Sequence, residues 1–185
     1  MVFQIVSLLL EVVVGLVAGT CLLRLYMQQQ GIPLSVRYNP LGRFVFALTD
    51  WIVLPLRRLL PSMGRLDTAS LVAAFLLELA QFGLLWVLAG GMGSLVSVVV
   101  LALFGLVRLT ISGLSGLVMV YAVLSWMPSR SPMTDMLERL VTPPLVPIRR
   151  AIPLIGGVDL SPLVLLLILQ VAVIVVGHLQ NAVMF

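Results

Sequence analysis

The chain has 185 residues, of which 61% are hydrophobic and 10% are charged, with a formal net charge of +4 at pH 7. A water-soluble domain of this length could not bury so much apolar surface, so the composition excludes an ordinary soluble protein and is typical of a polytopic membrane protein. The single cysteine, Cys21, excludes an internal disulfide.

Four apolar stretches are long enough to cross a bilayer, which takes about 20 helical residues. They cover residues 2–26, 68–89, 95–127 and 160–180. The first has no Lys or Arg before Arg24, and Thr20 precedes Cys21, so we interpret it as a retained span and not a cleaved signal. The third is too long for one perpendicular span. It is either a strongly tilted helix or a span preceded by a separate interfacial piece before Gly105, with a re-entrant or fifth half-span less favoured.

The arginines predict the orientation of these spans. All eleven basic residues are arginine, and nine of them lie between the first and second spans or between the third and fourth. The short connection at 90–93 carries none. The positive-inside rule therefore places both connecting segments in the cytoplasm and both termini in the periplasm.

Each cytoplasmic segment opens with a helix signal. Asn39–Pro40 and Ser131–Pro132 each read as an N-cap followed by proline at the first helical position. Apolar residues at three-and-four spacing then predict a short amphipathic helix in the second segment, lying at the membrane surface or packed against the spans. These residues are Met133, Met136, Leu137, Leu140 and Val141. We expect Pro143–Pro144 to end this helix, and the more apolar segment 41–53 to lie deeper.

A repeated motif links the two halves of the chain. The stretch PLRRLLPSMGRLD at 55–67 returns at 147–159 as PIRRAIPLIGGVD, and the same offset relates Pro40 to Pro132. We therefore predict an internal duplication of residues 1–90 and 91–185. The fold class is an all-α membrane protein with two parallel repeats, each of two transmembrane helices joined by a cytoplasmic amphipathic helix and a Pro-x-Arg-Arg loop.

The repeated motif supplies most of the candidate site. Its prolines predict a loop with no more than one helical turn, reversed at its glycine, and its aspartate lies where it could cap the following span. In the second copy Ser161–Pro162 competes for that cap, which would leave Asp159 for another partner. The candidate residues are Pro55, Arg57, Arg58, Pro61, Gly64, Asp67, Pro147, Arg149, Arg150, Pro153, Gly156 and Asp159.

The two arginine doublets have three interpretations. They could hold anionic phospholipid headgroups, pair with Asp67 and Asp159 to brace the loop, or serve only as topology determinants. The last interpretation does not explain why prolines, a glycine and an aspartate recur around them in fixed register.

Three ionisable residues fall inside predicted spans: Glu11, Glu78 and Arg108. Each costs about 2.5 kcal/mol or more at the bilayer centre, so each needs a partner or water. A pair between Arg108 and one of the two glutamates is the simplest arrangement, and a conduction or proton-relay role is the alternative. Arg24, at the cytoplasmic end of the first span, is expected to extend toward the interface.

Signals of catalysis are absent from the sequence. It has one histidine, His178, and one cysteine, so no histidine or cysteine cluster could hold zinc. It contains no phosphate-binding loop, nucleophile elbow or paired catalytic carboxylates. We therefore expect a protein that is not an enzyme and that needs no cofactor or metal.

The quoted motifs resemble those of the YggT family of small bacterial inner-membrane proteins, which has relatives in chloroplasts. The resemblance covers nearly the whole chain and rests on Arg24-Leu-Tyr-Met-Gln, Asn39-Pro40, the doubled Pro-x-Arg-Arg motif, Leu124-Ser-Trp-Met and Asp159-Leu-Ser-Pro162. One departure is Tyr121, where many relatives carry a basic residue. The resemblance implies a bacterial inner-membrane location, and roles in osmotic and potassium tolerance, cell division or membrane-complex assembly. It supplies no catalytic residues.

Two functional hypotheses follow. The first is a non-enzymatic inner-membrane protein that supports osmotic or ion homeostasis, or membrane-complex and cell-envelope assembly, through its arginine-rich cytoplasmic loops. Its expected partners are anionic phospholipid and other membrane proteins, with homo-oligomers also considered and no nucleic acid. The second is a small oligomeric ion channel or transporter subunit, for which only Glu11, Glu78, Gln81, Arg108 and Gln170 could line a polar path.

Overall fold

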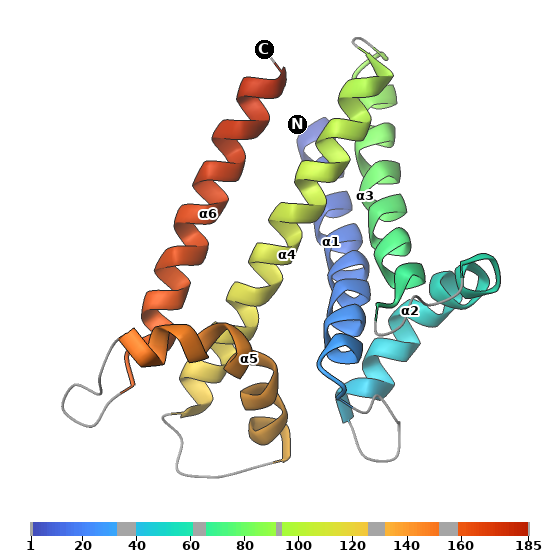
Figure 1. Cartoon of the computed structure of the whole chain (residues 1–185). Helices are drawn as coiled ribbons and strands as arrows, with labels where there is room; N and C mark the ends of the chain where they lie inside the picture. The colour runs from blue at the N-terminus through green and yellow to red at the C-terminus, as the bar shows by residue number, and fades with distance from the viewer. Residues whose placement is uncertain are drawn as a thin grey trace. The chain divides into compact units, whose positions relative to one another are not determined.

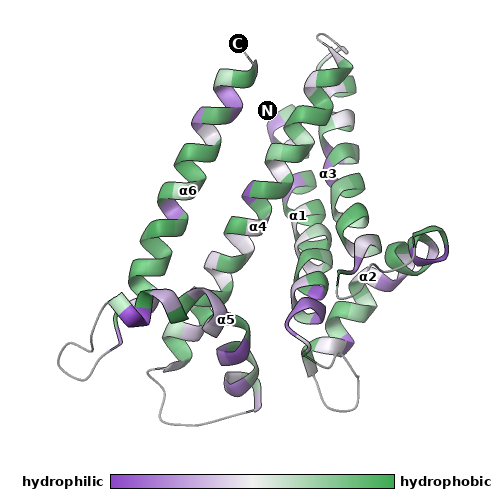
Figure 2. Cartoon of the chain, viewed as in Figure 1, coloured by the Kyte–Doolittle hydropathy of each residue, from purple (hydrophilic) through white to green (hydrophobic). Residues whose placement is uncertain are grey.

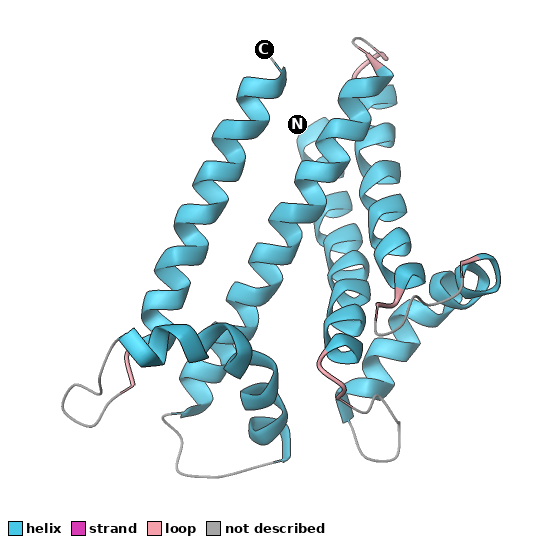
Figure 3. Cartoon of the chain, in the orientation of Figure 1, coloured by secondary structure: helices cyan, strands magenta, loops and turns pink. Residues whose placement is uncertain are grey.

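A computed structural model describes residues 2–32, 40–60, 66–91, 94–125, 132–151 and 159–184. Within these ranges the chain is almost entirely helical, with short loop segments beside some of the helix ends (Figure 3). The six helices are α1 (Val2–Gln29), α2 (Pro40–Leu59), α3 (Thr68–Leu88), α4 (Leu95–Ser125), α5 (Pro132–Ala151) and α6 (Ser161–Met184), as labelled in Figure 1.

Four of these helices are long and apolar enough to cross a membrane. The candidate spans are Phe3–Gln29, Thr68–Leu88, Leu95–Ser125 and Ser161–Val183, which confirms the four stretches predicted from hydropathy. Figure 2 shows hydrophobic residues dominating α1, α3, α4 and α6, whereas hydrophilic residues are frequent in α5. The chain is therefore an all-helical membrane protein throughout its described part.

The third span is one continuous helix. α4 runs through Gly105 for 31 residues, so the alternative of a separate interfacial piece before Gly105 is wrong. A helix of this length rises about 46 Å, against a hydrocarbon core of about 30 Å. The expectation of a strong tilt follows from that difference in length.

The described residues form two compact units, residues 1–110 and 111–183. The division falls within α4, whereas the predicted repeats meet at residues 90–91. The first half of α4 belongs to the first unit because Leu106 and Leu109 pack against that unit's core.

The core of the first unit is built largely from small residues. Ala69, Ala73 and Ala74 of α3 are fully buried together with Ala18 and Cys21 of α1. Small side chains let neighbouring helix backbones approach closely, which is how helices associate in a membrane. Val53 of α2 completes this core, so α2 is packed against the two spans that it connects.

The second unit buries the apolar stripe of α5 against α4 and α6. Val141 and Leu145 of α5 cluster with Val118 of α4 and Leu165 of α6. On the opposite side of α5, Asp135, Glu138 and Arg139 are exposed. The predicted amphipathic helix is therefore confirmed, and its first residue is Pro132 as expected.

The prediction that prolines end the cytoplasmic helices is wrong. α2 continues through Pro55 to Leu59, and α5 continues through Pro143, Pro144 and Pro147 to Ala151. Proline lacks the N–H that would bond the carbonyl four residues earlier, so it bends a helix that packing holds together and does not always stop it. Figure 1 shows the ribbons of both helices changing direction along their length.

Glycines with positive φ shape two helix ends. Gly31 has φ of 67° just after α1, and the Ile32 N–H bonds the Met27 carbonyl at 3.0 Å. Gly90 and Gly91 have φ of 90° and 67° after α3. A side chain would strain either backbone, so glycine allows the chain to turn sharply after both spans.

Candidate functional site

The first arginine of the first doublet joins three parts of the chain. Arg57 lies in the last turn of α2 and forms an ion pair with Asp67, the residue that precedes α3. The Arg57 Nη2 also donates to the Gln28 Oε1 at 3.2 Å, near the end of α1. One guanidinium therefore connects the end of one span to the beginning of the next.

Asp67 caps α3, as its position in the sequence predicted. Its Oδ2 accepts a hydrogen bond from the Ser70 hydroxyl at 2.7 Å, and its Oδ1 lies 3.4 Å from the Ser70 N–H. Burial alone would raise the pKa of this carboxyl, but hydrogen bonds from Arg57 and Ser70 outweigh it and hold the pKa below its ordinary value of 3.8. Asp67 is therefore an ionised carboxylate in a fully buried position.

The first arginine of the second doublet makes an analogous set of contacts. The Arg149 Nε donates to the Asp159 Oδ2 at 2.9 Å, and its Nη2 lies 3.1 Å from the Tyr121 hydroxyl. Tyr121 belongs to α4, and Asp159 precedes α6. Tyr121, noted above as a departure from the family pattern, therefore takes the place that Gln28 has beside Arg57.

Asp159 both caps α6 and pairs with Arg149. Its Oδ1 accepts from the Ser161 N–H at 2.9 Å while its Oδ2 holds Arg149. Burial opposes ionisation, but the bonds from Ser161 and the charge of Arg149 lower the pKa of the carboxyl below 3.8. Burial likewise opposes the charge on Arg149, yet its bonds to Tyr121 and Asp159 raise the guanidinium pKa above its ordinary value.

The two ion pairs have the same spacing. Arg57 and Asp67 are separated by ten residues, as are Arg149 and Asp159. One of the three interpretations of the doublets was pairing with Asp67 and Asp159. The first arginine of each doublet makes that pair. We call Arg57 and Arg149 the bracing arginines.

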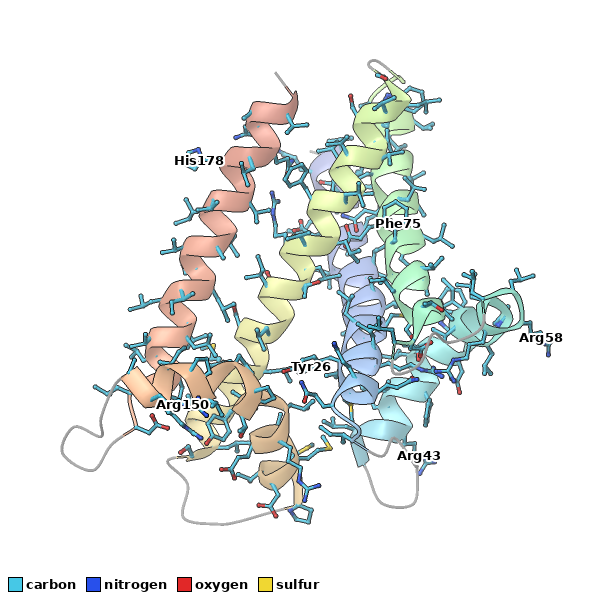
Figure 4. The ribbon with its side chains drawn as sticks, viewed as in Figure 1. Tyr26, Arg43, Arg58, Phe75, Arg150 and His178 are labelled. Carbon is cyan, nitrogen blue, oxygen red and sulfur yellow. The ribbon has the colours of Figure 1, made fainter. Side chains whose placement is uncertain are left out.

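The second arginine of each doublet has a different environment. Arg58 and Arg150 are exposed, and no ion pair joins either of them to another described residue. We call these two residues the outward arginines. Figure 4 shows Arg58 extending away from α2.

Arg24 forms a buried network that the sequence did not predict. Its side chain was expected to extend toward the interface, but only 1% of the residue is exposed, so that expectation is wrong. The Arg24 Nη1 donates to the Thr49 Oγ1 at 2.8 Å and to the Asp50 Oδ1 at 2.7 Å. Thr49 in turn donates to the Val45 carbonyl at 2.7 Å.

The same arginine connects this network to the brace of the first unit. The Arg24 Nε lies 3.7 Å from the Asp67 Oδ2, and the guanidinium stacks 4.8 Å from the centre of the Phe46 ring. Two guanidinium groups and two carboxylates thus meet where α1, α2 and α3 converge. The signal in the sequence was an arginine late in an apolar span combined with Asp50, the one acidic residue in α2.

Polar residues inside the spans also gather in the first unit. Glu78 is only 5% exposed and Gln81 is 8% exposed. Arg108 attracts the Glu78 carboxylate and Glu11 repels it, so Arg108 interacts with Glu78, one of the two glutamates considered as its partner. A methyl group on Gly105 would come within 2.7 Å of the Phe82 ring and would also meet the Glu78 carboxylate, so glycine lets α4 approach α3 here.

The remaining predicted site residues either lie inside helices or fall outside the residues that the structure describes. Pro55 and Pro147 are inside helices α2 and α5, so the doublets end helices and do not form the predicted Pro-x-Arg-Arg loop. Pro61, Gly64, Pro153 and Gly156 lie outside the described residues, as does the chain reversal expected at the two glycines.

Comparisons with known proteins place this chain among uncharacterised relatives. A model of the CCB3/YggT family matches residues 1–88 and 100–180. The chain is 36% identical over 166 residues to the uncharacterized protein YggT of Escherichia coli K12, covering 89% of this chain and 85% of that protein. It is 32% identical over 182 residues to an uncharacterized protein in the proC 3′ region of Vibrio alginolyticus, covering 97% of both. No solved structure matches.

Proposed function

Because the chain belongs to the CCB3/YggT family, we propose that it is a non-enzymatic inner-membrane protein acting through the ends of α2 and α5. In this proposal it supports osmotic and ion homeostasis, or the assembly of membrane complexes and the cell envelope. The ends of α2 and α5 act on phospholipid headgroups or on partner membrane proteins.

One observation carries the proposal. Each doublet divides its two charges: Arg57 and Arg149 form ion pairs with aspartates, whereas Arg58 and Arg150 are exposed and form no ion pair with another described residue. A single arginine would suffice for the brace, so the second charge at each helix end is available for something outside the protein. An exposed arginine at a membrane surface attracts anionic groups.

The proposed orientation puts both outward arginines in the cytoplasm. Nine of the eleven arginines lie in the two segments that contain α2 and α5, and the positive-inside rule favours the cytoplasmic side for such segments. Both termini are then periplasmic. With this orientation the outward arginines lie next to the cytoplasmic leaflet, which carries the negative surface potential.

We further propose that residues 1–90 and 91–185 descend from one duplicated segment. Buried positions in α2 recur in α5 at the offset of the sequence repeat: Val45 and Leu137, Thr49 and Val141, Val53 and Leu145. The brace recurs at the same offset. In this proposal the repeats are parallel and related by an axis along the membrane normal, an arrangement that puts the two matching helix ends on one side of the membrane.

A second candidate function, an oligomeric ion channel or transporter subunit, is favoured by the polar groups inside the first unit. Glu78 and Gln81 are buried in α3, and Glu11 and Arg108 interact with Glu78. A carboxylate opposite a guanidinium is also the arrangement that makes buried charge tolerable in a membrane. Structural pairing therefore accounts for Glu78 and Arg108 without conduction.

Complementation tests the main proposal. A bacterial strain that lacks its own member of the family would express this chain and would be exposed to hyperosmotic shock. The proposal predicts restored survival relative to an empty vector. Survival no better than with the vector, at normal membrane abundance of the protein, would overturn it.

Ion flux separates the two candidates. Purified protein reconstituted in vesicles should pass no more K⁺ than protein-free vesicles if the main proposal holds. Flux that is present with the parent and lost with Glu78→Gln would instead identify a conduction path through the first unit.

A further inference from the structure

The exposed side of α2 combines large apolar side chains with arginines. Phe44 is 51% exposed and Trp51 is 63% exposed, and Leu54 is exposed between them and the helix end. We call this surface the α2 outer face; its residues are Arg43, Phe44, Ala47, Trp51, Leu54 and Arg58, all exposed. At 3.6 residues per turn these six positions occupy one side of the helix.

The inner side of α2 fixes the direction of this face. Val45, Thr49 and Val53 recur every four residues and are fully buried. Arg24 holds Thr49 and Asp50 through its Nη1. The helix therefore cannot turn Trp51 inward without breaking the hydrogen bonds from Arg24 to Thr49 and Asp50 and exposing its buried residues.

The charge on the outer face is uncompensated by acids within α2. The one acidic residue of α2 is Asp50, and its carboxylate is paired with Arg24 at 2.7 Å. Among the described residues no ion pair involves Arg43 or Arg58. Figure 4 shows these two side chains extending away from the ribbon near opposite ends of the helix.

α5 provides an internal comparison, since its exposed side has a different character. Asp135 and Glu138 are exposed there together with Arg139 and Arg150, so two negative charges offset two positive ones. No aromatic residue occurs anywhere in α5. The two cytoplasmic helices thus present different chemistry despite their similar buried sides.

We propose that the α2 outer face is a binding surface for anionic phospholipid in the adjoining leaflet. Trp51, Phe44 and Leu54 enter the boundary between headgroups and acyl chains, where tryptophan is favoured and amphipathic helices lie. Arg43 and Arg58 contact headgroup phosphates on either side of them. The exposed side of α5, which carries two acidic residues and no aromatic residue, is not part of this surface.

The position of α2 within the first unit supports this occupant. α2 lies between α1 and α3 in the chain (Figure 1), next to the ends of the two candidate spans Phe3–Gln29 and Thr68–Leu88. The same face of a second copy is an unsuitable occupant, because like-charged arginines would meet. Anionic phospholipid is thus one specific partner within the proposed function. The inference rests on that function only in taking the leaflet next to α2 to be the cytoplasmic one.

The fluorescence of Trp51 can report whether this side chain contacts lipid. The chain has three tryptophans, so Trp86→Phe with Trp126→Phe leaves Trp51 as the single fluorophore. This protein would be reconstituted in vesicles of phosphatidylcholine and phosphatidylglycerol, with bromine, a fluorescence quencher, on the acyl chains of one lipid or the other. We expect brominated phosphatidylglycerol to quench Trp51 on the order of twofold more strongly at equal mole fraction.

Matched variants separate charge from position. Arg43→Gln with Arg58→Gln should abolish the preference for phosphatidylglycerol while quenching itself persists. Arg139→Gln, which removes an exposed charge on α5, should leave the preference unchanged. If the α2 variant fails to accumulate, high salt applied to the parent should remove the preference instead, because salt screens exposed charges.

Two results would overturn the inference: equal quenching by both brominated lipids in the parent at low salt, or no quenching by either. The osmotic test remains independent. A chain that keeps the lipid preference but does not restore survival would refute the proposed function and leave the lipid surface standing, and the opposite pair of results would refute the lipid surface alone.

Discussion

Arg57 pairs with Asp67 across ten residues of sequence, and the aspartate that it holds is the N-cap of α3. The same guanidinium donates to Gln28 of α1. Two spans and the helix between them are therefore tied at one point, and Arg149 with Asp159 makes the corresponding tie in the second unit. Several outcomes follow from these contacts.

Arg24→Met should strongly destabilise the protein. The substitution keeps much of the side-chain volume but leaves the Asp50 carboxylate without its partner and removes a charge next to fully buried Asp67. Because the Asp50 side chain is 39% exposed, water can partly replace Arg24 there, and we expect a loss of about 1–3 kcal/mol, the cost of leaving interior polar groups without a hydrogen bond. Thermal unfolding in detergent is the measurement, with exposed Arg139→Met as the control that should unfold like the parent. A melting temperature equal to that of the control would show that the Arg24 network contributes little.

Acid should weaken the braces in a defined range of pH. Asp67 and Asp159 have pKa values below 3.8 in the folded state. A carboxyl with a depressed folded pKa stabilises the fold fully above its unfolded pKa, and that stability is lost as the pH falls through the folded pKa. We expect a constant melting temperature between about pH 7 and 5 and a decrease below about pH 4.

The matching control removes both carboxylates. Asp67→Asn with Asp159→Asn should already melt lower at neutral pH and should show a shallower decrease in acid. If parent and double variant lose stability equally between those pH values, the acid sensitivity comes from other groups.

Gly105→Ala should disturb the packing of α4 on α3. The added methyl group would lie 2.7 Å from the Phe82 ring and would also meet the Glu78 carboxylate, so two side chains would have to shift together. Overpacking of this kind costs about 1–3 kcal/mol. Gly83→Ala is the control, because an added methyl group there meets nothing within 4 Å and alanine favours a helix. The account predicts a lower melting temperature for the first variant only, so equal melting of the two would contradict the close approach.

Much of the fold could be predicted because the spans obey a simple rule. Long apolar stretches must form helices in a bilayer, and Leu95 to Ser125 is mostly apolar with Arg108 as its one charged residue. The role of Asp67 was also predictable, since an aspartate just before an apolar run is a common cap. The pairing of Arg57 with Asp67 was one of three interpretations, and the sequence alone could not choose among them.

The errors arose where tertiary contacts override local rules. Pro143 and Pro144 were expected to end α5, but burial of Leu140, Val141 and Leu145 on one side holds the helix together through them. Arg24 was expected to extend toward the interface because it lies near the end of a span. Its partners come from other parts of the chain, so they could not be recognised in the sequence. Thr49, Asp50 and Asp67 converge on it only in the folded chain.

The orientation in the membrane is a prediction from arginine placement. A reporter that is active only in the periplasm should be active when fused after Phe185, and a cytoplasmic reporter at the same place should be inactive. The reverse pattern would overturn the cytoplasmic position of α2 and α5, and with it the leaflet named for the lipid surface.

The most direct measurement compares the two members of each doublet in living cells. Arg57→Gln with Arg149→Gln removes the bracing arginines, and Arg58→Gln with Arg150→Gln removes the outward ones. Membrane abundance and survival of hyperosmotic shock would be measured in the same cultures. The account predicts that the first variant fails to accumulate, and that the second accumulates like the parent but no longer protects the cells. An outward-arginine variant that accumulates normally and survives like the parent would contradict the claim that these charges carry the function.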